Sequence, residues 1–196
     1  MNSREKILTC ARDLFHQVGY QATSVDVILR NCGVAKSNFY YHFKTKDDLA
    51  HAVLDLQASE YEAAAEETLH NPDLLPADRL RRFCEQIGNT QVERKHHAGC
   101  PFGNFAAALS TSEGDERAEM FRGRLCVFFD RLERQLTECL TEGVALGEFR
   151  SDLAPQEMAR CLLATIEGLM MFAKTRRDAR FLYSGLHIAI TLLQDR

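Results

Sequence analysis

The feature that most constrains this chain is an unbroken run of aromatic rings, Phe39 to Phe43, within the segment KSNFYYHFKTKDDL. Lys36, Lys44 and Lys46 flank the run. Five consecutive side chains point in all directions around a helix, so they cannot all enter one core. Some of these rings must therefore serve something outside the protein.

The segments on either side of this run carry the signals of short helices. Apolar residues recur at helical spacing over residues 7–18, with Ser3 as the expected N-cap. A second helix is expected to start at a cap on Thr23 and to end at Gly33, which can take a left-handed conformation. A third short helix is expected to run to about Tyr41.

A fourth helix is expected to begin at Thr45. Asp48 stands three residues further on, where an acidic side chain completes a capping box, and the apolar pattern continues to Leu56. Two short helices joined by a tight turn that contains glycine form a helix-turn-helix unit, whose second helix can enter the major groove of DNA.

The helical period sorts the aromatic run into two groups. Phe39 and Phe43 share one face and are expected to pack against the first two helices. The other side chains of the segment are expected to face the DNA. The Tyr40 hydroxyl is expected to reach a phosphate, and Lys46, in the first turn of the next helix, is expected to bind another. The alternative is that all the rings form a small core. The groove-facing group consists of Lys36, Asn38, Tyr41 and His42.

Charge and composition fit this interpretation and exclude others. The chain has 196 residues and a formal net charge of −4, which is +2 over residues 1–50 and −6 over the rest. A mildly basic N-terminal part is compatible with an anionic partner for that part alone. No apolar run approaches the roughly 18 residues of a membrane span, and the N-terminus lacks the apolar stretch of a signal peptide. Seven dispersed cysteines suit reduced thiols. We therefore expect a cytoplasmic protein without membrane contact.

The segment TSVDVILRNCGVAKSNFYYHFKTKDDL resembles the N-terminal domain of the TetR family of bacterial transcriptional regulators. The resemblance runs from about Ile7 to Leu56. It implies an all-α homodimer whose two heads bind double-stranded DNA at a near-palindromic operator, with a DNA-binding domain over residues 1–48 and a sensor and dimerisation domain over residues 49–196. By this resemblance the DNA-contacting residues are Thr23, Lys36, Ser37, Asn38, Tyr40, Tyr41, His42 and Lys46.

One position departs from the pattern of that family. Ala35 stands where the family commonly has Ser or Thr at the start of the recognition helix, so a cap and a phosphate contact are in doubt. Ser37 is the nearest hydroxyl that can replace part of that cap.

The rest of the chain reads as further helices separated by three breaks. The breaks lie at residues 69–80, 147–155 and 175–179 and contain proline or charged turn segments. Proline at position 155 suits the first residue of the helix that follows. We expect about nine helices in all.

The last two of these helices are apolar on two faces each, which predicts burial on both sides. They form either the centre of a large monomer or an interface with a second subunit, and the sequence favours the dimer. The resemblance likewise implies a four-helix dimer bundle from this region. The predicted interface residues are Ile166, Leu169, Met170, Leu182, Leu186, Ala189 and Leu193.

Cys100 is a possible sensor. It directly precedes Pro101, a favoured first residue of a helix, and Arg94, Lys95, His96 and His97 come just before it. A helix N-terminus and nearby cations both lower the pKa of a thiol. The GCPFGN segment also resembles a cysteine motif in TetR-like regulators, some of which respond to reactive electrophiles. The alternative is that Cys100 is a buried structural residue. His97 and Cys100 alone do not make a metal site.

The sequence predicts a repressor that is released by an unknown small effector, either an apolar or aromatic molecule or an electrophile. It contains no Gly-rich phosphate loop, complete metal motif or nucleophile elbow, so we expect neither an enzyme nor a cofactor. The competing hypothesis is a helical ligand-binding or scaffold protein with a degenerate DNA-binding head.

Overall fold

The computed structural model describes residues 2–93, 99–109, 114–152 and 154–194. These residues form nine helices and no strand, which confirms the predicted all-α fold and helix count for the described part of the chain. Each predicted break contains a connection between two helices, although residues 76–80 already belong to the helix that follows the first break. The helices are α1 (Ser3–Gln17), α2 (Val25–Cys32), α3 (Lys36–His42), α4 (Lys46–Thr68), α5 (Pro76–Glu93), α6 (Pro101–Ala107), α7 (Glu116–Ala145), α8 (Pro155–Arg176) and α9 (Arg180–Gln194).

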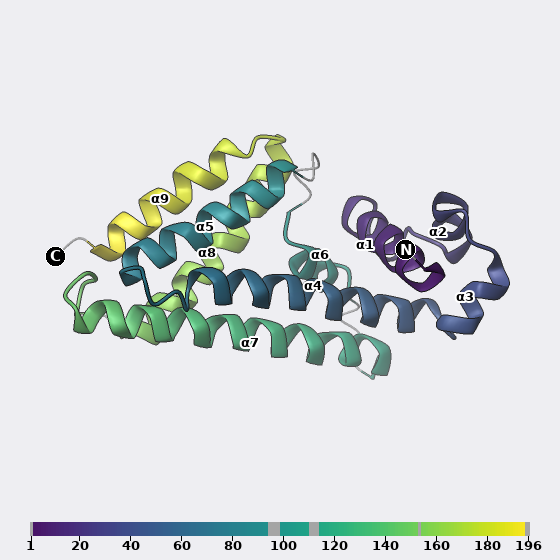
Figure 1. Ribbon diagram of the computed structural model, residues 1–196, viewed down its shortest axis with the longest axis horizontal. Coiled ribbons are helices and arrows are strands. Elements are labelled where there is room, and N and C mark those ends of the chain that lie inside the picture. Colours follow the sequence, from purple (N-terminus) through teal and green to yellow (C-terminus); the bar gives the residue numbers. More distant parts are fainter. Residues whose placement is uncertain (1, 94–98, 110–113, 153, 195–196) are drawn as a thin grey trace. The chain divides into compact units, whose positions relative to one another are not determined.

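Two compact units make up the chain. The first unit contains Met1–Glu60 together with Pro101–Leu125, and the second contains Tyr61–Cys100 together with Cys126–Arg196. In the first unit, α1 packs against α2, α3 and α6, and α3 leads directly into α4 (Figure 1). In the second unit, α9 packs against both α5 and α8 (Figure 1). The predicted boundary between a DNA-binding domain (residues 1–48) and a sensor and dimerisation domain (residues 49–196) divides the chain by function, and it stays a prediction.

The helix caps differ in detail from the predicted ones. Asn2 caps α1, not Ser3: its side chain accepts a hydrogen bond from the Glu5 amide at 2.9 Å, and the Glu5 carboxylate accepts one from the Asn2 amide at 3.0 Å. This reciprocal pair satisfies two amides that the first turn of a helix leaves unpaired. Ser3 is instead the first residue of the helix.

The predicted cap of α4 is confirmed. The Thr45 hydroxyl accepts a hydrogen bond from the Asp48 amide at 3.0 Å, and the Asp48 carboxylate accepts one from the Thr45 amide at the same distance. The same carboxylate also accepts from the amide of Lys44 at 3.1 Å. These bonds fix where α3 stops and where α4 starts.

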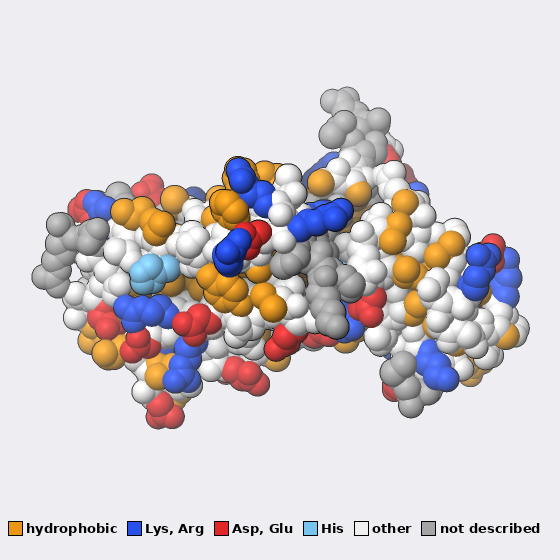
Figure 2. Space-filling model, turned by 90° about the horizontal axis from the view of Figure 1, so that it is seen from above, with side chains coloured by type: hydrophobic (Ala, Val, Ile, Leu, Met, Phe, Trp, Pro, Cys, Tyr) orange, Lys and Arg blue, Asp and Glu red, His pale blue; other side chains and the backbone are white. Residues whose placement is uncertain are grey.

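The seven residues predicted for the dimer interface stay a prediction, and they differ in burial within the single chain. Four side chains are between 0 and 2% exposed and lie in the core of the second unit: Ile166, Met170, Leu182 and Leu186. Leu169, Ala189 and Leu193 are half-buried. Both helices are apolar on two faces, and the exposed apolar side chains belong to the other face: Met171, Phe172, Phe181, Ile188 and Leu192. Hydrophobic side chains are also visible on the surface of the second unit in Figure 2.

Close packing in the second unit predicts a stability difference between two glycines of α7. A Cβ at Gly143 would overlap the buried ring of Phe149 and lie 3.1 Å from the Pro76 side chain, whereas a Cβ at Gly123 would meet nothing within 4 Å. Alanine in a helix gains about 1 kcal/mol over glycine. Overpacking of a core typically costs about 1–3 kcal/mol, and a buried ring has little room to move.

We therefore expect Gly143→Ala to lower the melting temperature and Gly123→Ala to raise it. At about 2–4 °C per kcal/mol for a chain of this size, thermal unfolding followed by circular dichroism resolves both effects. Equal melting temperatures for the two variants would contradict the packing of Phe149 against α7.

Among the described residues, no helix is both long enough and apolar enough to cross a bilayer.

Candidate nucleic-acid interface

The turn between α2 and α3 has the geometry that the sequence predicts. Gly33 ends α2 with φ +65°, a left-handed conformation that residues with a side chain adopt rarely, and its amide bonds the carbonyl of Leu29. Phe39 and Phe43 are buried, and their ring centroids lie 5.9 Å apart. These two rings anchor α3 on the head, so its opposite face is left for other contacts.

That opposite face of α3 is the candidate interface. Tyr41 is 84% exposed and Tyr40 is 54% exposed. Aromatic rings stabilise a fold mainly when they are buried, so two exposed rings contribute little to the core of this head. Lys36, Ser37 and Asn38 are exposed as well. His42 is half-buried, with its ring edge-on to Tyr41 at 4.9 Å between centroids. The structure thus brings six predicted contact residues together on one short helix.

Lys36 is held in place by the preceding helix. Its ammonium group donates to the Asp26 carboxylate at 3.1 Å, and this hydrogen bond raises the pKa of Lys36. Because both side chains are largely exposed, the ion pair contributes little to stability. Its effect is to orient a permanent positive charge at the start of α3. Ala35 gives α3 no side-chain cap, as the sequence predicts.

Two of the predicted contact residues face inward. Thr23 is 1% exposed, and its hydroxyl donates to the Gly19 carbonyl at 2.8 Å. The cap of α2 is the neighbouring Ser24, whose hydroxyl accepts from the Val27 amide at 3.3 Å. The predicted cap on Thr23 is therefore wrong, whereas its DNA contact stays a prediction, with the side chain buried in this structure.

Lys46 is the second residue that turns inward. Its ammonium group donates to the carbonyls of Tyr20 at 3.0 Å and Thr23 at 3.1 Å, and lies 4.2 Å from the centroid of the Tyr20 ring. Burial, followed by the charge of Arg117, lowers the pKa of Lys46. Lys46 therefore ties the start of α4 to the loop between α1 and α2, and its predicted phosphate contact stays a prediction.

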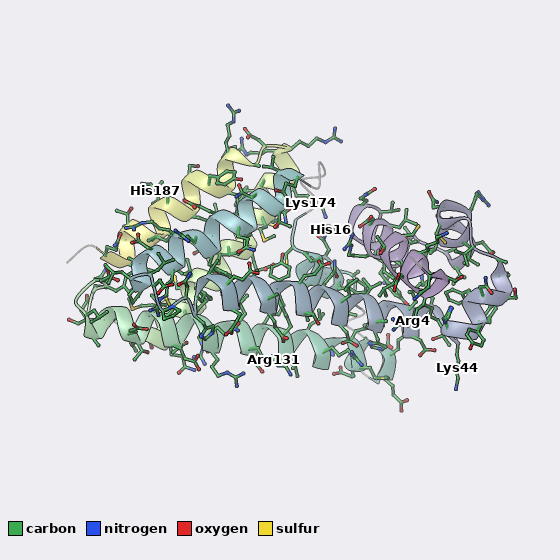
Figure 3. All side chains as sticks on the ribbon, in the orientation of Figure 1. Arg4, His16, Lys44, Arg131, Lys174 and His187 are labelled. Atoms are coloured by element: carbon green, nitrogen blue, oxygen red, sulfur yellow. The ribbon has the colours of Figure 1, made fainter. Side chains whose placement is uncertain are left out.

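Sequence reasoning left one exposed cation out of the predicted contacts. Lys44 follows α3 directly, and its side chain extends away from the ribbon in Figure 3. Its amide is bound by Asp48, which fixes the backbone at this position. The signal was present, because Lys44 flanks the aromatic run. It is a better candidate for a phosphate contact than Lys46.

A polar cluster links the head to the start of α7 within the first unit. The Tyr20 hydroxyl donates to Asp47, and Arg117 donates to Tyr20 and to both carboxylate oxygens of Asp47, at 2.8 and 2.9 Å for the latter. Burial and the hydrogen bond to Asp47 raise the pKa of Tyr20 to about 12, so its hydroxyl stays protonated. Sequence reasoning missed this cluster, since its members are far apart in the chain.

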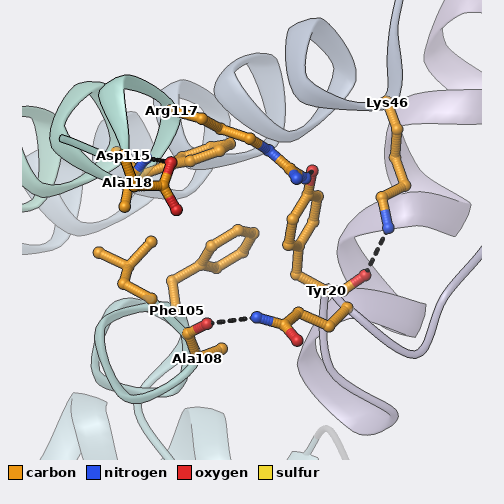
Figure 4. A pocket seen from close by; sticks show the side chains of 10 residues that line it. Tyr20, Lys46, Phe105, Ala108, Asp115, Arg117 and Ala118 are labelled. Atoms are coloured by element: carbon orange, nitrogen blue, oxygen red, sulfur yellow. Dashed lines mark hydrogen bonds between the residues drawn. The ribbon is translucent and has the colours of Figure 1, made fainter. Parts of the chain in front are cut away.

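Next to this cluster lies a cavity of about 320 Å³ (Figure 4). Phe105 and Phe121 form its apolar wall, with the ring of Tyr20 between 5.3 and 5.5 Å from both. The Gln21 amide closes one side by donating to the Ala108 carbonyl at 2.6 Å. This volume is at the lower end of the range of about 300–1,000 Å³ that is typical of ligand pockets.

Cys100 lies directly before α6, the position that the sequence predicts, and its side chain is buried. Burial raises the pKa of Glu167, on α8, and a hydrogen bond with Cys100 partly opposes that rise. The four basic residues that suggested an acidic thiol, Arg94 to His97, lie outside the described residues. Among those described, no cluster of three metal-ligating side chains occurs.

The fold and this interface define a helix-turn-helix regulator, and comparison with known proteins agrees. Residues 7–53 match the N-terminal domain of the bacterial regulatory proteins of the tetR family, and residues 76–187 match a tetracyclin repressor-like C-terminal domain. The chain belongs to the TetR family of DNA-binding transcriptional regulators.

Individual relatives cover almost the whole chain. An uncharacterised helix-turn-helix regulator of Lactococcus lactis is 28% identical over 192 residues, which are 97% of this chain and 92% of the relative. The transcriptional repressor DhaR of Mycobacterium sp. strain GP1 is 28% identical over 175 residues, 89% of this chain and 84% of DhaR. The regulatory protein TetR of Rhodobacter sphaeroides has the same fold, with a TM-score of 0.87 at 22% identity, over 96% of this chain and 97% of its own.

Proposed function

We propose that the protein is a homodimeric repressor that binds a near-palindromic operator and leaves it when a small effector binds. The observation that carries the proposal is the exposed face of α3, where Tyr40, Tyr41 and His42 stand beside Lys36 while Phe39 holds the helix from behind. Side chains of these types bind phosphates and base edges. Repression is supported by relatives such as DhaR, which is itself a transcriptional repressor. We place the protein in the cytoplasm, where its DNA is, and assign it no enzymatic activity.

The exposed apolar residues of α8 and α9 support the homodimer. Ile188 and Leu192 lie one helical turn apart on α9 and are both 57% exposed, while Met171 and Phe172 are exposed near the end of α8. An apolar surface of this kind is unfavourable in water unless a partner covers it. A second copy of the chain would cover it symmetrically, and would give the operator a second head.

The effector is proposed to be small and largely apolar or aromatic. Two cavities of the described structure have partly apolar linings: the one beside Tyr20 and Phe105, and one of about 190 Å³ between α5 and α9. An electrophile that reacts with Cys100 is the other candidate. Either effector relieves repression only if it binds the DNA-free arrangement of the heads more tightly than the DNA-bound one.

Salt-dependent binding to one DNA sequence would test this function. We expect the reduced protein to bind a single imperfect palindrome among duplexes that tile the DNA upstream of its own gene, as measured by fluorescence anisotropy with competitor DNA. With about six phosphate contacts, the affinity should fall roughly 10³-fold between 50 and 200 mM salt. A scaffold with a degenerate head would show neither sequence preference nor this slope. If no tile and no random-sequence selection yields a preferred site, the proposed function is wrong.

A further inference from the structure

Two cysteine thiols meet in the head of the protein, away from the interface described above. Cys10 lies on α1 and Cys32 is the last residue of α2. The Cys10 thiol donates to the Ile28 carbonyl at 3.5 Å, and the Cys32 thiol donates to the adjacent carbonyl of Leu29 at 3.6 Å. Cys32 also acts electrostatically on Cys10, and both side chains are only half-buried. The packing of α1 on α2 thus brings two partly accessible thiols to neighbouring carbonyls of α2.

The surroundings of this pair disfavour reactions that need a free thiolate. Burial raises the pKa of Cys10 to about 11, and Cys32 and Asp13 add to that rise. Cys10 therefore keeps its proton at neutral pH, so attack on peroxide is slow. A thiophilic atom that bonds to both sulfurs does not need a free thiolate, because it displaces the two thiol protons as its bonds to sulfur form. The second bond then forms within one molecule, at high effective concentration.

We propose that Cys10 and Cys32 form a dithiol site for thiophilic centres that bond to two sulfur atoms, with trivalent organoarsenicals as the class of ligand. For an arsine oxide, two arsenic–sulfur bonds form while the arsenic–oxygen bond and both S–H bonds break. The oxygen leaves with the two protons as one molecule of water, and arsenic remains trivalent. No oxidant or reductant is needed.

The other cysteines provide internal comparisons. Cys84 and Cys139 lie near enough to interact, but each is 3% exposed, so a reagent cannot reach them in the folded protein. Cys126 on α7 and Cys161 on α8 are exposed thiols on different helices. The pair in the head is the one that combines proximity with access.

Occupancy of the site is expected to weaken operator binding, a consequence that rests on the proposed function. Cys32 directly precedes Gly33, the left-handed residue that sets the direction of α3. A single arsenic atom bonded to both sulfurs fixes them relative to each other and removes the two S–H hydrogen bonds to the carbonyls of Ile28 and Leu29, and so shifts the end of α2 and this turn. We expect a fall of at least tenfold in operator affinity.

Intact-protein mass spectrometry of the reduced, full-length protein with phenylarsine oxide would test the site. The wild type should carry one adduct that survives excess 2-mercaptoethanol and is removed by 2,3-dimercaptopropanol. Cys10→Ser and Cys32→Ser should each lose this adduct, whereas Cys84→Ser, Cys100→Ser and Cys161→Ser should keep it. Circular dichroism of each variant would confirm that it is folded.

The proposal is overturned if the wild type forms no monothiol-resistant adduct, or if folded Cys10→Ser and Cys32→Ser retain it. Anisotropy with operator DNA then tests the linkage: an adduct on the pair with unchanged affinity refutes it. The mass measurement contains no DNA, so a failure of the proposed DNA-binding function would leave its result unaffected.

Discussion

Replacing Ile188 with glutamate is expected to yield a folded monomer that binds the operator at least 100-fold more weakly than the wild type. Ile188 is 57% exposed in the single chain, so the substitution leaves the core of the second unit intact. In the proposed dimer it would bury two carboxylates in an apolar interface, at a cost of several kcal/mol for each unpaired charge. Once the subunits separate, each head binds its half-site alone and loses the effective concentration of about millimolar that the linkage provides.

Light scattering coupled to size-exclusion chromatography would give the mass, and anisotropy would give the affinity. Val127→Glu is the matched control, because Val127 is similarly exposed at 51% but lies on α7. We expect that variant to remain dimeric with unchanged affinity. A dimeric Ile188→Glu protein, or a dimer broken equally by both changes, would show that subunits do not meet through this face of α9.

Tyr41→Ala is expected to reduce operator affinity about 100-fold without changing stability. Tyr41 is 84% exposed, so removing its ring costs no core packing. A specific contact to DNA is typically worth about 1–3 kcal/mol, and a dimer would lose it in both heads. Since about 1.4 kcal/mol corresponds to a factor of ten, a loss of about 1.4 kcal/mol in each head, in the lower part of that range, gives the expected effect.

Three comparisons make the Tyr41 measurement decisive. Tyr41→Phe separates the contribution of the hydroxyl from that of the ring. Met120→Ala removes an exposed apolar side chain of α7 and should leave the affinity unchanged. Thermal unfolding of all three variants should match the wild type. Full affinity in Tyr41→Ala would remove this residue from the interface and leave the other candidates on α3 and Lys44.

The helix-turn-helix head is predictable from the sequence because its determinants are local. Gly33, the Thr45 and Asp48 cap, and the burial of Phe39 and Phe43 all follow from spacing within a few residues, and all are found. The cap of α2 was wrong by one residue because Thr23 and Ser24 both carry a hydroxyl. The backbone angles at these positions decide which of the two residues caps the helix, and the spacing of residues does not show those angles.

The inward turn of Lys46 and the burial of one face of α9 could not be predicted from the sequence, since both depend on contacts between distant segments. Lys46 turns inward to carbonyls 23 and 26 positions earlier in the chain. The two apolar faces of α9 look alike in sequence, and only the packing of α5 and α8 shows that the face with Leu182 and Leu186 is internal. Distant contacts of this kind leave no periodic signal.

The cluster around Tyr20 limits how freely the DNA-binding head of this protein could be replaced by the head of another regulator. Arg117, Phe105 and Phe121 come from beyond residue 100, yet they complete the packing and hydrogen bonding of the loop between α1 and α2. A chimaera joined after residue 48 would keep Tyr20 and Asp47 but would pair them with foreign residues. The helix-turn-helix segment and the first turns of α7 are therefore expected to have been inherited together. Transfer of a new operator specificity into this scaffold requires both segments.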